Sequence, residues 1–380
     1  MLTTLAVAGY RSLVDVVLPL GELTVLTGAN GSGKSNLYRA LRLLAAVGRG
    51  QAVGAIAREG GLDSVLWAGP ETPQGLGAQG TVRSRPVSVQ LGFASDDLGY
   101  LIDLGLPQLG GASPFVRDPE IKQEQVFRGP LARPATLVLD RQRTGVRVRG
   151  DDGWVSVNQS LGPGQSVLLD LVDGSAAPET VALRHTLASW RFYDHFRTDA
   201  ASPARLPRVG TRTRWLRHDG ADLAAVWATI EDAGAGAALS EAVERAFPGA
   251  RVSVTASEGV FRLRLHQPGL LRALDAAELS EGTLRYLLLC AALLSAQPAP
   301  LIVLNEPESS LHEALIEPLG DLLCAASRRS QLIVVTHSAA LRERIKRSGA
   351  DIVELESFGL GTQVRGRGPL ERPPWHWPRR

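Results

Sequence analysis

The feature that most constrains the fold is a glycine-rich segment near the N-terminus, Gly28-Ala29-Asn30-Gly31-Ser32-Gly33-Lys34-Ser35. It fits the pattern G-x-x-x-x-G-K-[ST] at every fixed position. The apolar run Leu23–Thr27 precedes it and predicts a strand, and the spacing of the leucines that follow predicts a helix from Lys34 to about Ala46. Strand, loop and helix in this order predict a phosphate-binding loop in an α/β protein.

The residue types of this loop suit phosphate chemistry. Glycines let the backbone curl until several N–H groups point at phosphate oxygens, and the helix N-terminus adds partial positive charge. We expect Lys34 to contact the β- and γ-phosphates of a nucleotide and the Ser35 hydroxyl to bind Mg²⁺. Lys34 is one of only three lysines in the chain, which otherwise uses arginine. A GTPase would also need a base-reading Asn-Lys-x-Asp, which the sequence lacks.

The composition is that of a folded globular chain. Of its 380 residues 44% are hydrophobic and 21% are charged, which predicts two or three domains, or one large domain with an insertion. The longest apolar run, Tyr286–Leu294, is nine residues long, whereas a membrane helix needs about 20. Two cysteines, Cys290 and Cys324, cannot form a disulfide framework. We therefore expect a cytoplasmic protein with no membrane partner.

The second half of the chain alternates helices with short apolar strands. Helices are predicted at 283–296, 311–326 and 338–346, strands at 301–304 and 331–336, and a strand pair after them. Such alternation predicts a parallel sheet covered on both faces. In contrast, short alternating segments between residues 86 and 170 predict a meandering antiparallel sheet.

Polar residues follow the predicted parallel strands and open one of the helices. Glu306, after the strand 301–304, is placed to polarise a water molecule for attack on a γ-phosphate. Ser280 and Gly282 open the helix before that strand and predict a second anion-binding helix N-terminus. His337 follows the strand 331–336 and can donate a hydrogen bond to a phosphate oxygen, although alone it is more typical of an ordinary strand end.

These motifs, in this order, resemble those of the ABC-type ATPases, in particular the RecF, SMC and OLD-like branch. The residues that carry the resemblance are Arg11, Gly28–Ser35, Asn36, Leu279–Gly282, Asn305–Glu308, Ser310–His312 and Thr336–Ser338. The resemblance implies an α/β fold, a P-loop NTPase head with mixed antiparallel and parallel sheets, flanking helices and a compact α+β insertion. It implies an N-terminal half at 1–180, an insertion at 181–270, a C-terminal half at 271–366 and a flexible tail at 367–380.

The same resemblance implies the cofactors and the site. Two subunits meet head to tail and enclose two ATP molecules, each with Mg²⁺. Glu306 is then the general base, Lys34 and His337 assist catalysis, and the metal is held by Ser35 and, through water, by Asn305. The loop from Ser310 to His312 crosses the dimer seam. The nucleotide contacts are implied to be Arg11, Gly28, Asn30, Gly31, Ser32, Gly33, Lys34, Ser35 and Asn36 of one subunit with Ser280 and Gly282 of the other.

Asn305 departs from the family pattern, which has an aspartate there. Asparagine keeps an oxygen acceptor but removes one negative charge, so hydrolysis is expected to be slow, unless Glu306 and Ser35 suffice. The glutamine of the family's Q-loop has two candidates, Gln74 and Gln90.

The long connection between Lys34 and Ser280 has no sustained heptads, so no long coiled coil is expected, and too few residues follow His337 for a Toprim domain. We expect a stand-alone head whose effector or nuclease is a separate chain. The net charge of +2 does not by itself indicate a nucleic-acid binder. Within the connection, however, the Arg184–Arg217 window interleaves arginines with aromatic residues, which indicates DNA, a protein surface or a solvated face. The window contains Arg184, Trp190, Arg191, Phe192, Tyr193, Phe196, Arg197, Arg205, Arg208, Arg212, Arg214, Trp215 and Arg217.

Two functions remain open at this point. The first is an ATP hydrolase that dimerises on ATP and acts on DNA in repair or anti-phage defence. The second is an ATP-gated dimerisation switch with negligible turnover, which serves as a scaffold for a partner effector. A transporter subunit is disfavoured because the connection is far too long.

Overall fold

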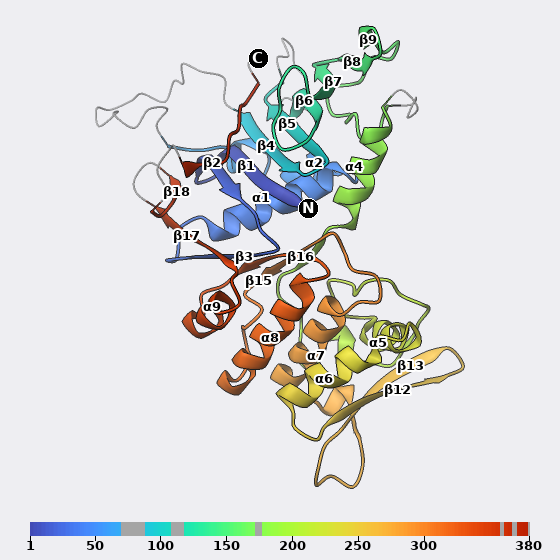
Figure 1. The fold of residues 1–380 in the computed structure, drawn as a ribbon. Coiled ribbons are helices and arrows are strands. Elements are labelled where there is room, and N and C mark those ends of the chain that lie inside the picture. Colours follow the sequence, from blue (N-terminus) through green and yellow to red (C-terminus); the bar gives the residue numbers. More distant parts are fainter. Residues whose placement is uncertain (70–87, 108–117, 172–176, 358–360, 367–370, 379–380) are drawn as a thin grey trace. The chain divides into compact units, whose positions relative to one another are not determined.

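The computed structural model describes residues 1–69, 88–107, 118–171, 177–357, 361–366 and 371–378 (Figure 1). Contacts divide the chain into two compact units. Unit 1 comprises Met1–Gly21, Thr27–Trp190 and Val353–Arg380, and unit 2 comprises Glu22–Leu26 and Arg191–Ile352. The domain boundaries expected from the sequence stay predictions.

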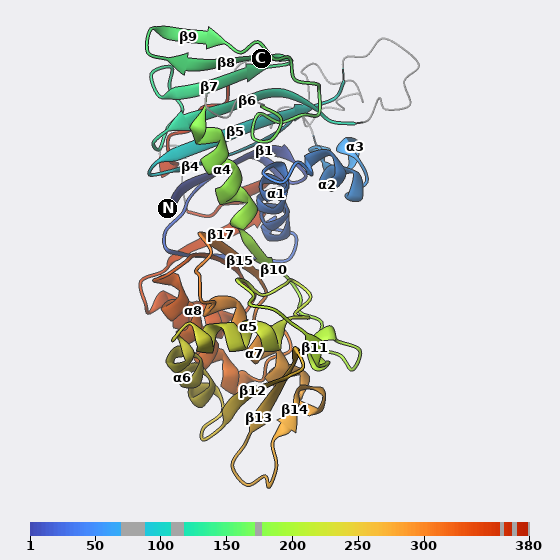
Figure 2. The same cartoon turned by 90° about the vertical axis from the view of Figure 1, so that its right-hand side faces the viewer.

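Unit 1 is built on an eight-stranded antiparallel sheet with the order β2-β1-β4-β5-β6-β7-β8-β9 (Figure 2). Each strand from β4 to β8 pairs with the next one along the chain, as in the predicted meander, and β1 joins the sheet by pairing with β4. The strands are β1 (Leu2–Tyr10), β2 (Leu13–Pro19), β4 (Ser88–Ser95), β5 (Leu98–Gly105), β6 (Glu120–Arg128), β7 (Leu137–Gln142), β8 (Gly145–Gly150) and β9 (Gly153–Ser156).

Helices α1 (Lys34–Val47) and α4 (Pro178–Ser189) pack on this sheet and on each other. Gly48 makes their close approach possible, because a Cβ there would lie 2.5 Å from the Cβ of Leu187. Two short helices, α2 (Ala52–Arg58) and α3 (Leu62–Val65), follow α1. The predicted helix from Lys34 to about Ala46 is thus confirmed.

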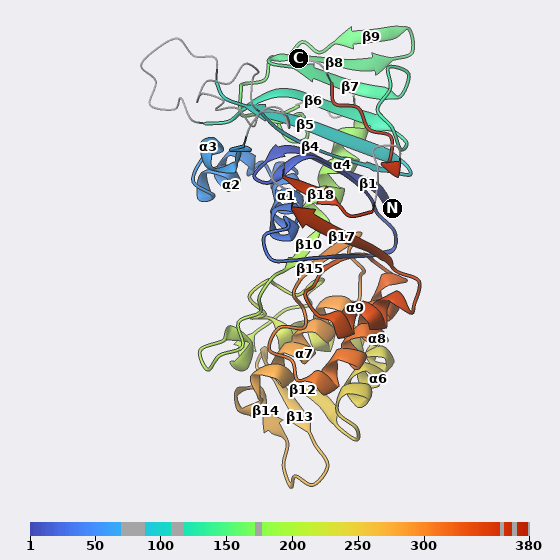
Figure 3. The ribbon, with the colours of Figure 1, turned by 90° about the vertical axis from the view of Figure 1, so that its left-hand side faces the viewer.

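The C-terminal part of the chain also belongs to unit 1. Strands β17 (Asp351–Ser357) and β18 (Thr362–Val364) form an antiparallel pair (Figure 3). Part of the segment expected as a flexible tail has contacts, because the Trp375 ring packs edge-on against Phe127 and the Trp377 indole nitrogen donates to Asp15 at 3.0 Å.

Unit 2 contains the predicted parallel sheet. It is the part of a six-stranded sheet with the order β10-β15-β16-β3, and each of these three pairings is parallel. The strands are β3 (Leu23–Gly28), β10 (Arg191–Tyr193), β15 (Leu301–Asn305) and β16 (Gln331–Val335), and the helices of this part are α7 (Glu281–Leu293), α8 (Ile316–Ser327) and α9 (Ala339–Lys346). These elements agree closely with the predicted ones, since apolar runs bounded by polar residues mark buried parallel strands.

The rest of unit 2 is a small α+β lobe. Helices α5 (Leu223–Asp232) and α6 (Gly236–Ala246) pack on α7 and on a hairpin of β12 (Arg251–Ser257) and β13 (Val260–His266). Two short strands, β11 (Arg208–Val209) and β14 (Leu274–Asp275), pair with β13. Single-turn 3₁₀ helices stand at Pro203–Arg205 (η1), Ala276–Glu278 (η2) and Glu313–Leu315 (η3). In the described part of the chain, no helix combines the length and the apolar character needed to cross a membrane.

Candidate nucleotide site

The glycine-rich loop has the backbone shape that phosphate binding needs. Gly28, Gly31 and Gly33 all have positive φ, at 144°, 78° and 102°. Gly33 is the N-cap of α1, and its carbonyl accepts from the N–H groups of Asn36 and Leu37, both at 3.0 Å. Such left-handed backbone is accessible mainly to glycine, so the sequence pattern and the conformation explain each other.

The Lys34 side chain is folded into this loop. Its ammonium donates to the carbonyl oxygens of Gly28 at 2.6 Å and Ala29 at 2.8 Å and to the Ser32 hydroxyl at 3.4 Å, and the residue is 4% exposed. The ammonium therefore lies within the glycine-rich loop, and an ammonium can form strong charge-assisted hydrogen bonds to phosphate oxygens.

A set of hydroxyls supports the loop from outside. Asn36 donates to Ser12 Oγ at 2.9 Å, and Ser12 Oγ lies 2.7 Å from Thr362 Oγ1. A Cβ at Gly33 would come within 2.0 Å of Thr362 Oγ1, so Thr362 packs directly on the loop. Asn36, expected among the nucleotide contacts, is therefore bonded to the turn between β1 and β2.

Arg11 lies in that same turn and is held by a carboxylate. Its guanidinium donates to Glu59 Oε2 at 2.7 Å, and the Tyr10 hydroxyl donates to the same oxygen at 2.7 Å. Burial, reinforced by this bond, raises the pKa of the Tyr10 hydroxyl, so Tyr10 remains a donor. Arg11 also has a left-handed φ of 50°, which is uncommon for a residue with a side chain.

The predicted base lies at the carboxyl end of a parallel strand in unit 2. Glu306 directly follows β15 with a φ of 48°, and its Oε1 lies 3.2 Å from Nε2 of His337, which follows the neighbouring strand β16 closely. Both side chains are about 40% exposed (44% and 39%), so water can reach them. The chain enters the glycine-rich loop just after Leu26, the β3 residue paired with Val335 of β16.

A second carboxylate fixes the segment after β16. Glu308 Oε1 accepts hydrogen bonds from the Thr336 hydroxyl at 2.5 Å and from the backbone N–H groups of His337 at 3.1 Å and Ser338 at 3.2 Å. The two strand ends that carry Glu306 and His337 are therefore tied together by one side chain.

Arg285 supports the same segment from helix α7. It is 1% exposed and donates to the carbonyl oxygens of Glu306 at 3.1 Å and Pro307 at 3.4 Å. Burial lowers the pKa of its guanidinium. Neither this residue nor Glu59 or Thr362 was assigned a role from the sequence. The available signal in the sequence is a charged residue directly before the long apolar run Tyr286–Leu294.

Ser280 and Gly282, which we call the signature residues, stand at the N-terminus of α7. Ser280 is its N-cap and accepts from the Thr283 N–H at 3.2 Å, and it is exposed. Gly282 is packed so that a Cβ would lie 3.1 Å from the Ser310 carbonyl oxygen. His312 caps η3 by accepting from the Ala314 N–H at 3.2 Å.

The donor set suits Mg²⁺ held mainly through oxygen and water. Within the described residues no three His, Cys, Asp or Glu side chains form a metal cluster. The side-chain oxygen of Asn305, Oδ1, is buried and has no hydrogen-bond partner among the described residues, so it is an open acceptor for a metal-bound water.

A family comparison bears on this arrangement. Residues 23–343 match the family described as "AAA domain, putative AbiEii toxin, Type IV TA system". The chain belongs to this AAA-domain family. The match runs from β3 to α9 and so includes the glycine-rich loop, the signature residues, Glu306 and His337.

Other relatives of this AAA domain are partial or distant. An OLD nuclease of Thermus scotoductus (strain ATCC 700910 / SA-01) is 48% identical over 44 residues, which make up 12% of this chain and 8% of that protein. The SmcHead solved with the C-winged helix domain of ScpA is 15% identical, with a TM-score of 0.50 over 96% of this chain and 97% of that one. The SMC head domain from Thermotoga maritima is 16% identical over 96% and 97% of the two chains, with a TM-score of 0.46.

The predicted recognition and fold class are confirmed. This AAA domain has the α/β fold of an ABC-type ATPase head, with mixed antiparallel and parallel sheets and flanking helices. Of the two Q-loop candidates, Gln90 lies in β4 and donates to Asp103 at 3.1 Å, and Gln74 lies outside the described residues.

The Arg184–Arg217 window differs from a base-stacking surface. Trp190, Tyr193 and Phe196 are 1%, 3% and 2% exposed, so they are core residues and cannot stack on bases. The guanidinium carbons of Arg191 and Arg214 lie 4.0 and 4.6 Å from the ring centroid of Trp215. The interleaving of aromatic residues with arginines in the sequence of this window does not show which aromatic side chains face the interior.

Proposed function

We propose that this protein is an ATP-binding and ATP-hydrolysing head that forms a head-to-tail dimer on Mg-ATP. The observation that carries the hydrolytic part is the Glu306–His337 pair at 3.2 Å, at the carboxyl ends of two adjacent parallel strands. Ligands of open parallel sheets bind at such ends. The glycine-rich loop, with its buried Lys34, supplies the triphosphate grip.

In the proposed reaction, Glu306 accepts a proton from the attacking water as the water oxygen bonds to the γ-phosphorus. The bond from that phosphorus to the bridging oxygen breaks, and ADP and phosphate leave. His337 donates a hydrogen bond to a γ-phosphate oxygen, and Lys34 offsets charge on the β- and γ-phosphates. Ser35 and a water on Asn305 would hold Mg²⁺, which would supply further charge neutralisation when bound.

The proposed dimer is supported by residues with anion-binding character at an accessible helix end. Ser280 and Gly282 stand at an accessible helix N-terminus, where the backbone N–H groups favour an anion. We assign them to the γ-phosphate of the ATP held by the partner copy.

The test separates binding from hydrolysis. Glu306→Gln should reduce steady-state phosphate release by about a hundredfold or more, because a general base is lost. The same variant should show a doubled solution mass with Mg-ATP, since it traps the ATP-bound dimer. Equal phosphate release by wild type and variant would remove Glu306 as the base, and a monomer at saturating Mg-ATP would contradict the dimer.

The second candidate is a switch with negligible turnover, which Asn305 favours because it contributes no negative charge near the metal. Phosphate release by the variant Asn305→Asp distinguishes the switch from the hydrolase. A large gain in phosphate release supports the switch, and no change supports the hydrolase.

For the biological role, we propose anti-phage defence with a separate effector chain. The support is the family description, which names a putative toxin, and the short match to an OLD nuclease. DNA binding or repair through the Arg184–Arg217 window has less support, because three of its aromatic residues are buried. Charge reversal at Arg208, Arg212 and Arg214 together would abolish salt-sensitive DNA binding if the window were a DNA site.

A further inference from the structure

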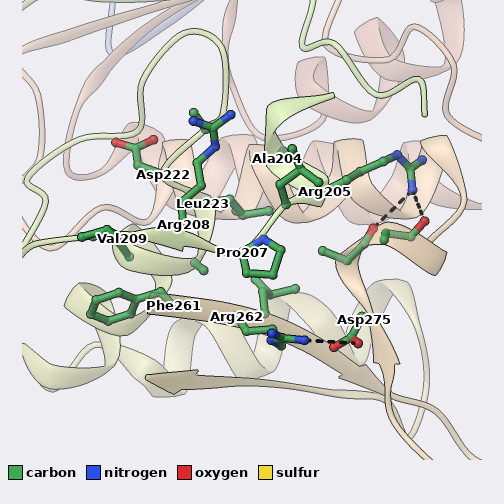
Figure 4. Close-up of a pocket in the computed structure, with 18 of the residues that line it drawn as sticks. Ala204, Arg205, Pro207, Arg208, Val209, Asp222, Leu223, Phe261, Arg262 and Asp275 are labelled. Carbon is green, nitrogen blue, oxygen red and sulfur yellow. Dashed lines mark hydrogen bonds and ion pairs between the residues drawn. The ribbon is translucent and has the colours of Figure 1, made fainter. Parts of the chain in front are cut away.

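The α+β lobe of unit 2 contains a cleft of about 450 Å³ (Figure 4). It lies where one edge of β13 loses its partners. Strand β11 pairs with Val260 and Phe261, and β14 pairs with Arg264 and Leu265, so neither short strand pairs with the two residues between them. Pro207, just before β11, has no N–H to continue the ladder. The chain therefore turns away on both sides, and the cleft opens over Arg262 and Leu263.

A buried arginine holds the two walls of this cleft in place. Arg205 stands on the first wall and donates to five backbone carbonyls, including Ala276 at 3.2 Å, Ala277 at 3.0 Å and Leu279 at 2.7 Å on the second. It is 7% exposed, and among the described residues no carboxylate pairs with it. Carbonyl dipoles satisfy its donors, but no formal negative charge opposes it, so this wall of the cleft carries positive charge.

The cleft combines apolar side chains with cations. Phe261, Leu223 and Pro207 line it, and Leu206 and Val209, which also line it, are 56% and 78% exposed, so apolar side chains are accessible there. The cations are Arg205, Arg208, Arg217 and Arg262, against two acids, Asp222 and Asp275.

One of these arginines, Arg208, is available to a ligand. Its side chain has no hydrogen bond or ion pair within the part of the chain that the structure describes. Arg262 forms a long ion pair with Asp275 at 4.0 Å, and Arg264 holds the same carboxylate at 2.8 Å. An apolar hollow beside unpaired positive charge fits a ligand that offers both an apolar group and a carboxylate.

We propose that this cleft binds a segment of a partner protein in which an acidic residue stands beside a large apolar one. The apolar side chain packs between Val209 and Phe261, and the carboxylate pairs with Arg208. The exposed backbone of β11 is available to the segment, because β11 is an edge strand. A DNA backbone has the charge but no apolar side chain for the hollow, so DNA is the less suitable occupant.

The wall of the cleft that contains Ala276 and Ala277 continues along the chain into Leu279–Gly282. What we infer from this continuity rests on the proposed function. The Leu279 carbonyl held by Arg205 belongs to the residue before Ser280, and the Thr198 hydroxyl donates to Glu281 at 3.4 Å. A segment bound in the cleft therefore acts on the residues assigned to the partner's ATP. We expect its affinity to differ with and without Mg-ATP in Glu306→Gln.

The test is a selection of randomised displayed peptides on the immobilised full-length protein without nucleotide. Enriched peptides should combine Asp or Glu with Leu, Phe or another large apolar residue. In fluorescence anisotropy with one such synthetic peptide, Val209→Asp and Arg208→Glu should each weaken binding about tenfold or more. Both side chains are exposed, so the fold should tolerate these changes. Leu271→Asp, an exposed position outside the cleft lining, is the matched control and should bind like wild type.

Three outcomes would overturn the proposal: no acidic and apolar enrichment, equal binding by Val209→Asp and wild type, or displacement of the peptide by duplex DNA. Because this assay contains no nucleotide, it can fail while ATP-driven dimerisation succeeds, and the reverse also holds. If the peptide binds equally with and without Mg-ATP, the link to Ser280 fails and the docking site stands.

Discussion

The side-chain oxygens of Ser12 and Thr362 lie 2.7 Å apart, although 350 positions separate the two residues. The bond joins the turn after β1 to the start of β18, and the Thr362 N–H also donates to the Ser12 carbonyl at 2.7 Å. Through Asn36 and Gly33, this pair braces the loop that we assign to phosphate binding.

Thr362→Val should weaken ATP binding about fivefold, because it removes the hydroxyl but keeps the side-chain volume. One lost hydrogen bond costs about 1 kcal/mol. Titration with a fluorescent ATP analogue measures the change, and Thr362→Ser, which keeps the hydroxyl, is the control. An unchanged dissociation constant in the valine variant would limit Thr362 to packing.

Gly33→Ala should abolish ATP binding for two reasons: the added Cβ would collide with Thr362, and residue 33 has a φ of 102°, which is strained for alanine. If the collision contributes, Thr362→Ala in the same chain should restore part of the affinity, while the strain of the positive φ remains. The measurement is ATP affinity in both single variants and the double variant. Strict additivity would show that only the backbone strain matters.

Glu59→Gln should increase ATP affinity about fivefold, because Arg11 is released while Tyr10 keeps an acceptor. A charged hydrogen bond between partly exposed side chains is worth about 1 kcal/mol. Arg11→Ala should lower the affinity and remove the effect of Glu59→Gln. If Glu59→Gln has the same effect with and without Arg11, the carboxylate does not act through Arg11.

Arg285→Met should lower kcat at least tenfold and leave the dissociation constant for ATP nearly unchanged. The variant leaves the Glu306 carbonyl without its donor, at a cost of about 1–3 kcal/mol, in a segment already strained at φ 48°. Single-turnover hydrolysis and equilibrium binding separate the two quantities, and Arg285→Lys should recover part of the rate. Equal losses in binding and turnover would indicate general unfolding instead.

The sequence predicted the parts of this protein that local patterns encode. The loop 28–35, the parallel strands and the residues after them are each a continuous stretch, so period and composition suffice to place them. Thr362 and Glu59 could not be predicted, because their partners are brought to them by sheet register and by the packing of short helices. The aromatic residues of the Arg184–Arg217 window were misleading for a related reason. Trp190 and Tyr193 lie among arginines in the sequence, yet their side chains are buried.

Glu308 has a consequence for how the proposed hydrolysis could be switched. One carboxylate oxygen binds the Thr336 hydroxyl and the N–H groups of His337 and Ser338, so the backbone of His337 is tied to the strand end that carries Glu306. The backbone that carries the proposed catalytic pair is thus assembled before any nucleotide binds. We therefore expect the proposed hydrolysis to be regulated by what reaches this backbone, such as the nucleotide or a second copy.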